Sequence, residues 1–297
     1  MQNIVLDLGN FDVKTSNKIA FTSRYVEVPK EDKDNYTGET VLEYNDKVYF
    51  MEKGSYESKD NKVERDYKPL LLAGIAKAIA PVTTAHINLC LLLPIRNINR
   101  KEDLINELEG KTFEYKYDKK NYKITIDKTG VLEEGMVSYY ALPKDKRKGR
   151  VLMLDFGGKT INGIAFNNGK VVEKLTYDKG ILQINEAILK ELYKNYTGQS
   201  IREEDIEEYI DRDIHGLKSI AAKQYLAYAK KANKWLDKFG DLSLYDAYLT
   251  GGAIQRLEPA IGEELKTKLP NYTVMEESRF TNATGAKNII DIKWKVK

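Results

Sequence analysis

Two aspartates in the sequence each stand at the end of an apolar run and directly before a glycine turn. They open the stretches Asp7-Leu8-Gly9-Asn10 and Asp155-Phe156-Gly157-Gly158, which share the order Asp, apolar, Gly, small. A short apolar run suits a strand covered on both faces, and open α/β sheets present their binding groups where such strands end. Successive N–H groups in a turn suit phosphate. The repeat therefore predicts two half-molecules that each offer a phosphate-binding turn.

A third glycine turn follows another apolar strand late in the chain. It is Tyr248-Leu249-Thr250-Gly251-Gly252-Ala253, and a helix-like stretch comes after it. Glycine lets a ligand approach the backbone closely. Three strand-end turns of this kind indicate one bound group that is reached from several elements.

This set of turns resembles the loops of the actin-like ATPases, in which two phosphate loops and an adenosine loop surround a nucleotide. Residues 7–14 resemble the first phosphate loop, residues 155–160 the second and residues 249–253 the adenosine loop. The late stretch 279–286 resembles that of the ParM-type proteins that segregate plasmids. The resemblance runs from residue 1 to about residue 290, with the motifs in the family's order.

The resemblance implies an α/β fold, specifically the actin-like two-domain ATPase fold with a nucleotide cleft between the domains. Domain I would cover residues 1–150 together with the C-terminal segment 278–297. A small inserted subdomain would occupy about 28–68. Domain II would cover residues 151–277.

The resemblance also implies which residues bind ATP and Mg²⁺. Asp7 and Asp155 would hold the metal, mainly through water, because Mg²⁺ gives up its waters reluctantly. Lys14 would reach the β- and γ-phosphates as a point charge. Arg256 and Asn282 would lie near the base, whose identity is open between ATP and GTP. The remaining nucleotide contacts would be Gly9, Asn10, Phe11, Asp12, Gly157, Gly158, Lys159, Thr160, Gly251, Gly252 and Ala253.

Two neighbouring acids compete for the catalytic role. The ParM pattern is Val-x-Pro-Glu, whereas this chain has Val131-Leu132-Glu133-Glu134. The register favours Glu134 as the residue that orients and deprotonates water, and the departure leaves Glu133 as the alternative. Under a structural interpretation, the pair instead forms the acidic first turn of a helix, where it complements the helix dipole.

A second departure from the family lies at Asn162, where the resemblance leads us to expect Asp. An amide can bind a water but brings no negative charge. Magnesium would then depend more on Asp7 and Asp155, and turnover would be slower.

The function implied is a filament-forming ATPase whose hydrolysis drives filament turnover and which segregates plasmid DNA. Its partners would be further copies of itself, a centromere-binding adaptor of the ParR type and, through that adaptor, plasmid DNA. Two alternatives stay open. One is an actin-fold small-molecule kinase, and the other is a nucleotide-binding scaffold without catalysis.

Composition excludes several other classes of protein. A net charge of +3 over 297 residues does not indicate direct binding of nucleic acid. One cysteine and two histidines cannot form an internal disulfide or a His/Cys metal site, which fits a reducing, cytoplasmic location. No apolar stretch is long enough to span a bilayer, so no membrane partner is expected.

Periodicity and turn residues predict the elements that position these groups. Hairpins are expected at 39–51, around Asn45-Asp46, and at 113–126. Strands are expected at 87–93 and at 130–136, the second running into a helix. Asn99 is expected to cap a helix that ends at residue 108. Further helices are expected at 70–80, 180–193 and 217–239, and one begins at the capping box 200–203 and runs to 210.

Overall fold

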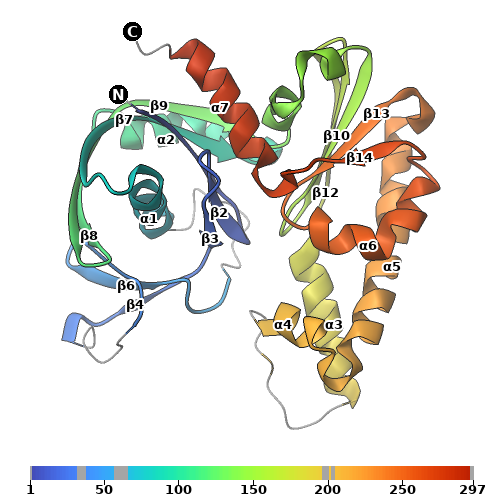
Figure 1. The fold of residues 1–297 in the computed structure, drawn as a ribbon, viewed down its shortest axis with the longest axis horizontal. Coiled ribbons are helices and arrows are strands. Elements are labelled where there is room, and N and C mark those ends of the chain that lie inside the picture. Colours follow the sequence, from blue (N-terminus) through green and yellow to red (C-terminus); the bar gives the residue numbers. More distant parts are fainter. Residues whose placement is uncertain (1, 32–37, 57–65, 196–200, 202–204, 295–297) are drawn as a thin grey trace. The chain divides into compact units, whose positions relative to one another are not determined.

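The structure is a computed structural model that describes residues 2–31, 38–56, 66–195, 201 and 205–294. The chain divides into two compact units. Unit 1 comprises residues 1–142 and 280–297, and unit 2 comprises residues 143–279. Each unit is built on its own sheet (Figure 1).

Unit 1 contains a nine-stranded sheet in the order β3-β2-β1-β7-β9-β8-β5-β6-β4. Its strands are β1 (Gln2–Leu8), β2 (Asp12–Thr15), β3 (Ala20–Thr22), β4 (Tyr25–Val28), β5 (Val41–Tyr44), β6 (Lys47–Met51), β7 (Thr84–Leu93), β8 (Thr112–Tyr117) and β9 (Lys120–Glu133). Its α-helices are α1 (Lys68–Ile79), α2 (Lys101–Leu108) and α7 (Thr281–Lys293), with 3-10 turns at η2 (Ile95–Arg100) and η3 (Val137–Ala141).

Unit 2 contains a five-stranded sheet in the order β12-β11-β10-β13-β14. Its strands are β10 (Arg150–Phe156), β11 (Ile161–Asn167), β12 (Lys170–Tyr177), β13 (Asp246–Thr250) and β14 (Tyr272–Val274). Its α-helices are α3 (Ile181–Asn195), α4 (Ile206–Asp211), α5 (Leu217–Leu236) and α6 (Ile254–Lys266), and its 3-10 turns are η4 (Lys144–Arg147), η6 (Ile214–Gly216), η7 (Asp237–Phe239), η8 (Leu242–Leu244) and η9 (Ser278–Phe280).

The two sheets share one five-strand pattern. In unit 1 the order β3-β2-β1-β7-β9 combines antiparallel pairs up to β1 with parallel pairs beyond it. In unit 2 the order β12-β11-β10-β13-β14 does the same about β10. Asp7 lies on β1 and Asp155 on β10, so the repeat in the sequence corresponds to a repeat in topology.

The sheet of unit 1 curls around α1, which forms the centre of its core (Figure 1). Ten of the twelve residues of α1 are buried, which explains why this helix has no polar face. At Gly74 an added Cβ would lie 3.3 Å from the Leu6 side chain, so α1 packs closely on β1. Burying the large apolar side chains of this helix contributes roughly 1.5–3 kcal/mol each.

The other face of the same strands is covered by α7. Val5, Cys90 and Leu92 form a second apolar cluster with Ala286 and Ile290 of this helix. Residues of β1 and β7 therefore alternate between two cores, one against α1 and one against α7. Because of this alternation, Asp7 shares the α7 face of β1 with Val5.

Most of the predicted hairpins and long helices are confirmed. The hairpin at residues 41–51 turns at Asn45-Asp46, whose φ angles of 50° and 61° suit the type I′ turn that two-residue hairpins favour. Asp118-Lys119 and Asn168-Gly169 turn in the same way. The helices expected at 70–80, 180–193 and 217–239 are α1, α3 and α5, the last ending at residue 236 before a 3-10 turn.

Two local predictions were wrong, and one falls partly outside the described residues. Asn99 does not cap a helix, because residues 95–100 form a 3-10 turn and α2 starts after Arg100. The strand expected at 130–136 is the end of the 14-residue β9, which pairs with β7 up to Glu133 and is followed by a 3-10 turn. The capping box at 200–203 includes undescribed residues, and the described helix begins at Ile206.

Candidate functional site

The first predicted phosphate loop is the tight connection between β1 and β2 in unit 1. Asp7 and Lys14 lie directly opposite each other in the antiparallel register, and Lys14 Nζ lies 3.5 Å from Asp7 Oδ2. Both side chains are largely buried, with 13% of Lys14 and 4% of Asp7 exposed. The lysine therefore balances the aspartate charge, which a buried carboxylate requires.

Glycine is needed at the tip of this loop. A Cβ on Gly9 would lie 2.5 Å from the carbonyl oxygen of Asp12, so no other residue fits without moving the backbone. The loop is held from outside by the Ser23 N–H, which donates to the Phe11 carbonyl over 2.9 Å. The Phe11 ring stacks on Tyr56 at 5.0 Å between centroids.

Asn10 supplies a polar atom that nothing in the described chain satisfies. Its Oδ1 atom is buried and has no hydrogen-bond partner among the described residues. Amide oxygen and nitrogen are assigned from their surroundings, so a rotated Asn10 would present its NH₂ group instead. As the amide lies, its oxygen is an acceptor and matches a hydrogen-bond donor such as water.

The second predicted loop lies in unit 2 and is fixed by the start of α3. The N–H groups of Ile181 and Leu182 donate to the carbonyls of Gly157 and Gly158, at 3.3 and 2.9 Å. Gly157 N–H donates to Thr160 O over 2.8 Å, whereas the Gly158 N–H meets no acceptor within the described part of the chain. The loop thus turns its carbonyls toward α3 and leaves a donor open.

Gly180 was missed by sequence reasoning and is essential for this arrangement. A Cβ there would lie 2.4 Å from Gly158 O and 2.6 Å from Gly157 O. The sequence contained a signal for this contact, namely a glycine directly before a helix. A glycine at that position lets the backbone of another loop approach closely. We therefore add Gly180 to the residues that shape the second loop.

The predicted adenosine loop packs directly on Asp155 within unit 2. Strand β13 lies parallel to β10, with Thr250 opposite Asp155 in the register. Gly251 has a φ of +95°, and a Cβ there would lie 2.5 Å from Asp155 Oδ1. Ala253 N–H donates to Phe156 O over 3.1 Å. The structure thus brings Asp155, Gly157, Gly158, Gly251, Gly252 and Ala253 to one end of the sheet of unit 2, with Lys159 and Thr160 in the same loop.

Asn162 occupies the position directly across from Asp155 on β11. It is buried, and its Oδ1 accepts a hydrogen bond of 3.0 Å from the Thr176 hydroxyl. The amide therefore stands where a second carboxylate would face Asp155. Within the described residues, no three His, Cys, Asp or Glu side chains form a metal-binding group.

Glu133 is the last residue of β9 and Glu134 follows it, two strands from β1 in unit 1. Glu133 pairs with Leu93 in register, and the Glu134 N–H donates to Leu93 O over 2.8 Å. Side chains alternate faces along a strand, so Glu133 shares the α1 face with Val131, and Glu134 continues the α7 face of Leu132. Asp7 follows Val5 on that same α7 face. Geometry within unit 1 therefore favours Glu134 over Glu133 as the acid on the side of Asp7.

Asn282 is buried and lies next to the turn that follows Glu134. It lies in the first turn of α7, and its Oδ1 accepts a hydrogen bond of 3.0 Å from Gly135 N–H. A Cβ on Gly285 would lie 1.9 Å from Val137 O, so α7 rests directly on the backbone that follows Glu134. Asn282 thus positions the turn that carries Glu134, a role that its sequence pattern did not indicate.

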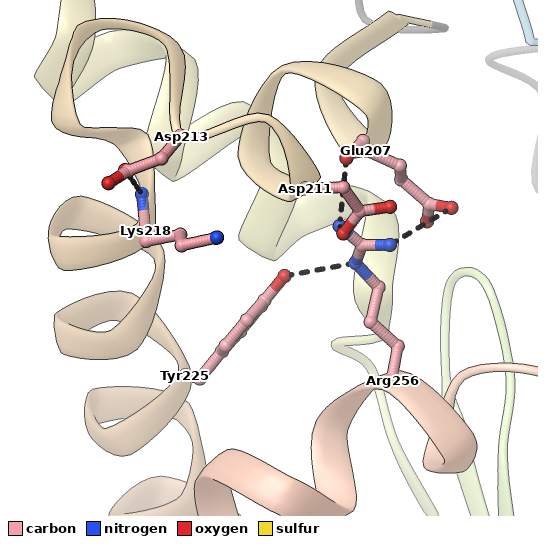
Figure 2. Close-up of polar contacts among 6 residues, drawn as sticks. All are labelled: Glu207, Asp211, Asp213, Lys218, Tyr225 and Arg256. Atoms are coloured by element: carbon pink, nitrogen blue, oxygen red, sulfur yellow. Dashed lines mark hydrogen bonds and ion pairs between the residues drawn. The ribbon is translucent and has the colours of Figure 1, made fainter.

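Arg256 is engaged by protein groups of two other helices (Figure 2). Its guanidinium lies 3.5 Å from Glu207 Oε2 and 3.2 Å from Asp211 Oδ1, and its Nε donates to Tyr225 Oη over 3.3 Å. Burial opposes the charge, but the bond to Tyr225 and the two carboxylates outweigh it and raise the pKa of Arg256. Arg256 therefore holds α4 and α5 against α6, and its contact with a base stays a prediction.

The turns of both units fit an oxygen-rich anion such as a phosphate chain. Each unit offers a strand-end aspartate and a glycine turn that a Cβ would obstruct, and within the described residues the turn of unit 2 adds the open N–H of Gly158. Oriented backbone amides of this type are the usual phosphate cradle. Nucleotide and metal roles for the individual residues stay predictions.

Comparison with known proteins gives matches in structure only. No protein-family model matches the chain, and a search of curated proteins finds no match. Among solved structures, the native archaeal actin homologue Ta0583 gives a TM-score of 0.79 at 16% identity, covering 98% of this chain and 100% of its own. Apo pSK41 ParM gives 0.72 at 17% identity, covering 99% and 98%.

A ParM from a 15-stranded Clostridium botulinum filament gives a TM-score of 0.77 at 17% identity, covering 96% of this chain and 98% of its own. All three matches run over nearly the whole of both chains. None of the helices in the described residues has the length and hydropathy to cross a membrane. The two related sheets and the extent of these matches together identify the chain as a protein with the actin-like fold.

Proposed function

We propose that the chain binds a purine nucleoside triphosphate with Mg²⁺, hydrolyses it and assembles into filaments with copies of itself. The observation that carries the proposal is the repeated strand-Asp-Gly turn, found at the same topological position of both sheets. A structural neighbour at 14% identity is an archaeal actin homologue in complex with ADP, and others are filament structures. We further propose that the filament segregates plasmid DNA through a ParR-type adaptor in the cytoplasm.

In this mechanism the glycine turns bind the phosphates through their backbone N–H groups. Lys14 would contribute a positive charge, and Asp7 and Asp155 would hold Mg²⁺ through its waters. Mg²⁺, when bound, neutralises charge that develops on the phosphate oxygens. Glu134 accepts a proton from the attacking water and aligns it, while Asn282 keeps the turn of Glu134 in place through Gly135.

A nucleotide-binding scaffold without useful hydrolysis is the second candidate. The observation that favours it is Asn162, since an amide faces Asp155 at a position where the family resemblance predicted a carboxylate. Such a protein would assemble with nucleotide and stay assembled. A small-molecule kinase has no comparable support among the described residues.

Light scattering measured together with phosphate release tests these functions. With ATP or GTP and Mg²⁺, we expect scattering to rise and then fall as phosphate is released. Asp155→Asn keeps the size of the side chain and removes its charge, so it should bind nucleotide more weakly while its melting temperature without nucleotide stays near that of the wild type.

Three other outcomes would change the conclusion. A stable rise without phosphate release supports the scaffold. Phosphate transfer to a small alcohol without any rise supports the kinase. No nucleotide binding at all by the wild-type protein would refute the proposal as a whole.

A further inference from the structure

A small cavity lies on unit 1 between the last turn of α7, the start of α2 and the end of β9. Its volume is about 150 Å³. Apolar side chains provide most of the wall, among them Cys90, Ile105, Val131, Leu132, Ile290 and Trp294. It is separate from the glycine turns described above, none of whose residues lines it.

Among the described residues, the carboxyl end of β9 has a neighbouring strand on one side only. Strand β8 pairs with β9 only over residues 120–125, so β9 beyond this point pairs with β7 alone. Glu134 N–H donates to Leu93 of β7, whereas Thr129 N–H donates to the Glu109 carboxylate just after α2, over 2.7 Å. Because N–H directions alternate along a strand, the N–H of Val131 points to the same side as that of Thr129. No acceptor for it occurs in the described part of the chain.

The other polar groups that line the cavity are two lysines, one carboxylate and one hydroxyl. Lys101 and Lys293 line it, against a single acid, Glu102. The Thr129 hydroxyl is buried and has no hydrogen-bond partner among the described residues. Burial raises the pKa of the Cys90 thiol to about 12, so this group is neutral at pH 7 and behaves as part of the apolar wall.

Trp294 closes the cavity in a way that depends on a glycine. A Cβ on Gly130 would lie 2.7 and 2.9 Å from two neighbouring ring atoms of Trp294, so the edge of the ring approaches the backbone of β9 only because residue 130 has no side chain. Trp294 thereby forms part of the apolar wall near Val131, which also lines the cavity. An apolar ligand with one acceptor group matches this combination.

We propose that this cavity binds a small carboxylic acid whose apolar body is about the size of a benzene ring. An apolar cavity of roughly 150 Å³ accommodates benzene. The carboxylate would accept hydrogen bonds from Val131 N–H and the Thr129 hydroxyl and would be attracted by Lys293. Charge-assisted bonds to a carboxylate are stronger than bonds to a neutral acceptor, which selects the acid over its amide.

Ligand-observed NMR titration of the nucleotide-free protein with benzoate and benzamide tests the proposal. We expect saturable binding of both, with benzoate tighter by about two- to fivefold, the range for a solvent-exposed charge pair. Lys293→Gln should remove the preference. Lys287→Gln, on the same helix but paired with Asp291, should keep it.

A second pair of variants separates the cavity from the general surface. Ile105→Trp places a large side chain in the cavity and should abolish benzoate binding, while Ile292→Trp adds the same group at a position that is 73% exposed and should not. Melting temperatures confirm that both variants fold. Absence of saturable benzoate binding, equal affinity for benzamide, or binding that survives Ile105→Trp would each overturn the proposal. None of these results depends on nucleotide binding.

Discussion

Exchanging Glu134 for glutamine separates the catalytic role of this residue from a structural one. The substitution keeps the length and polarity of the side chain but removes its ability to accept a proton. Loss of a positioned base lowers a rate by about 10²–10⁴-fold, which corresponds to roughly 2.7–5.5 kcal/mol in the activation barrier. We therefore expect Glu134→Gln to bind ATP and assemble, release phosphate at least about a hundredfold more slowly, and stay assembled.

The alternative role of this acid is worth far less energy in this structure. An acid in the first turn of an α-helix contributes about 0.3–1 kcal/mol, but the residues after Glu134 form only a five-residue 3-10 turn, Val137–Ala141. A loss of about 0.3 kcal/mol would shift the melting temperature by about 1 °C for a unit of this size. Stability and rate are therefore expected to respond on very different scales.

Glu133→Gln is the matched control, because Glu133 is the adjacent acid and faces the α1 side of the sheet. Strands β1 and β9 flank β7, so their ends lie about 9.6 Å apart, and only the acid on the Asp7 face can reach a group bound near Asp7. The assay is phosphate release alongside light scattering, with thermal melting of both variants. An inactive Glu133→Gln with a fully active Glu134→Gln would refute the argument from alternating faces, and full activity of both would remove the pair from catalysis.

Three further predictions concern the strand-end turns. Lys14→Ala removes the cation that lies 3.5 Å from the buried Asp7 carboxylate and should lower the free energy of unfolding by up to about 3 kcal/mol, measured by urea denaturation. Combining Lys14→Ala with Asp7→Asn should recover part of that loss, because the buried negative charge is then removed as well. Asn162→Asp places a carboxylate directly across from Asp155, so we expect the free energy of unfolding to fall by about 0.2–1 kcal/mol in EDTA and to recover with Mg²⁺. Equal melting temperatures of this variant in EDTA and in Mg²⁺ would place residue 162 outside the metal's surroundings. Gly251→Ala should abolish nucleotide binding and lower the free energy of unfolding by about 1–3 kcal/mol, because its Cβ would lie 2.3 Å from Phe156 O. Gly240→Ala is the control, since Gly240 also has a positive φ but its Cβ would have no atom within 4 Å. It should lower the free energy of unfolding by about 1 kcal/mol and leave binding intact.

The sequence predicted the fold through features that act locally and repeat. Asp7 and Asp155 each end a strand that is buried on both faces, and that pattern is visible without knowing which strands pair. The turn at Asn45-Asp46 follows from residues that tolerate positive φ. The actin-like architecture could be inferred because these local signals came in the order of a known family.

What the sequence could not show depends on contacts between distant residues. The choice between Glu133 and Glu134 requires the pairing of β9 with β7, because only the pairing shows which core each side chain faces. Asn282 acts through Gly135, 147 positions earlier, and Arg256 acts through α4 and α5. The order of residues along the chain does not show such partners. The family resemblance therefore predicted that Arg256 and Asn282 lie near the nucleotide.

The position of α7 along the chain also governs how the protein is made. This helix covers Val5, Cys90 and Leu92, yet it is synthesised only after the whole of unit 2, residues 143–279. At ribosomal speeds of about 5–20 residues per second, that interval is on the order of 10 s. During it, the nascent unit 1 leaves one face of its sheet uncovered and lacks Asn282, while unit 2 is a continuous segment that can fold as it emerges. Newly made chains therefore acquire the turn of Glu134 last, so a nascent chain on the ribosome is structurally immature at that turn even when its second sheet is complete.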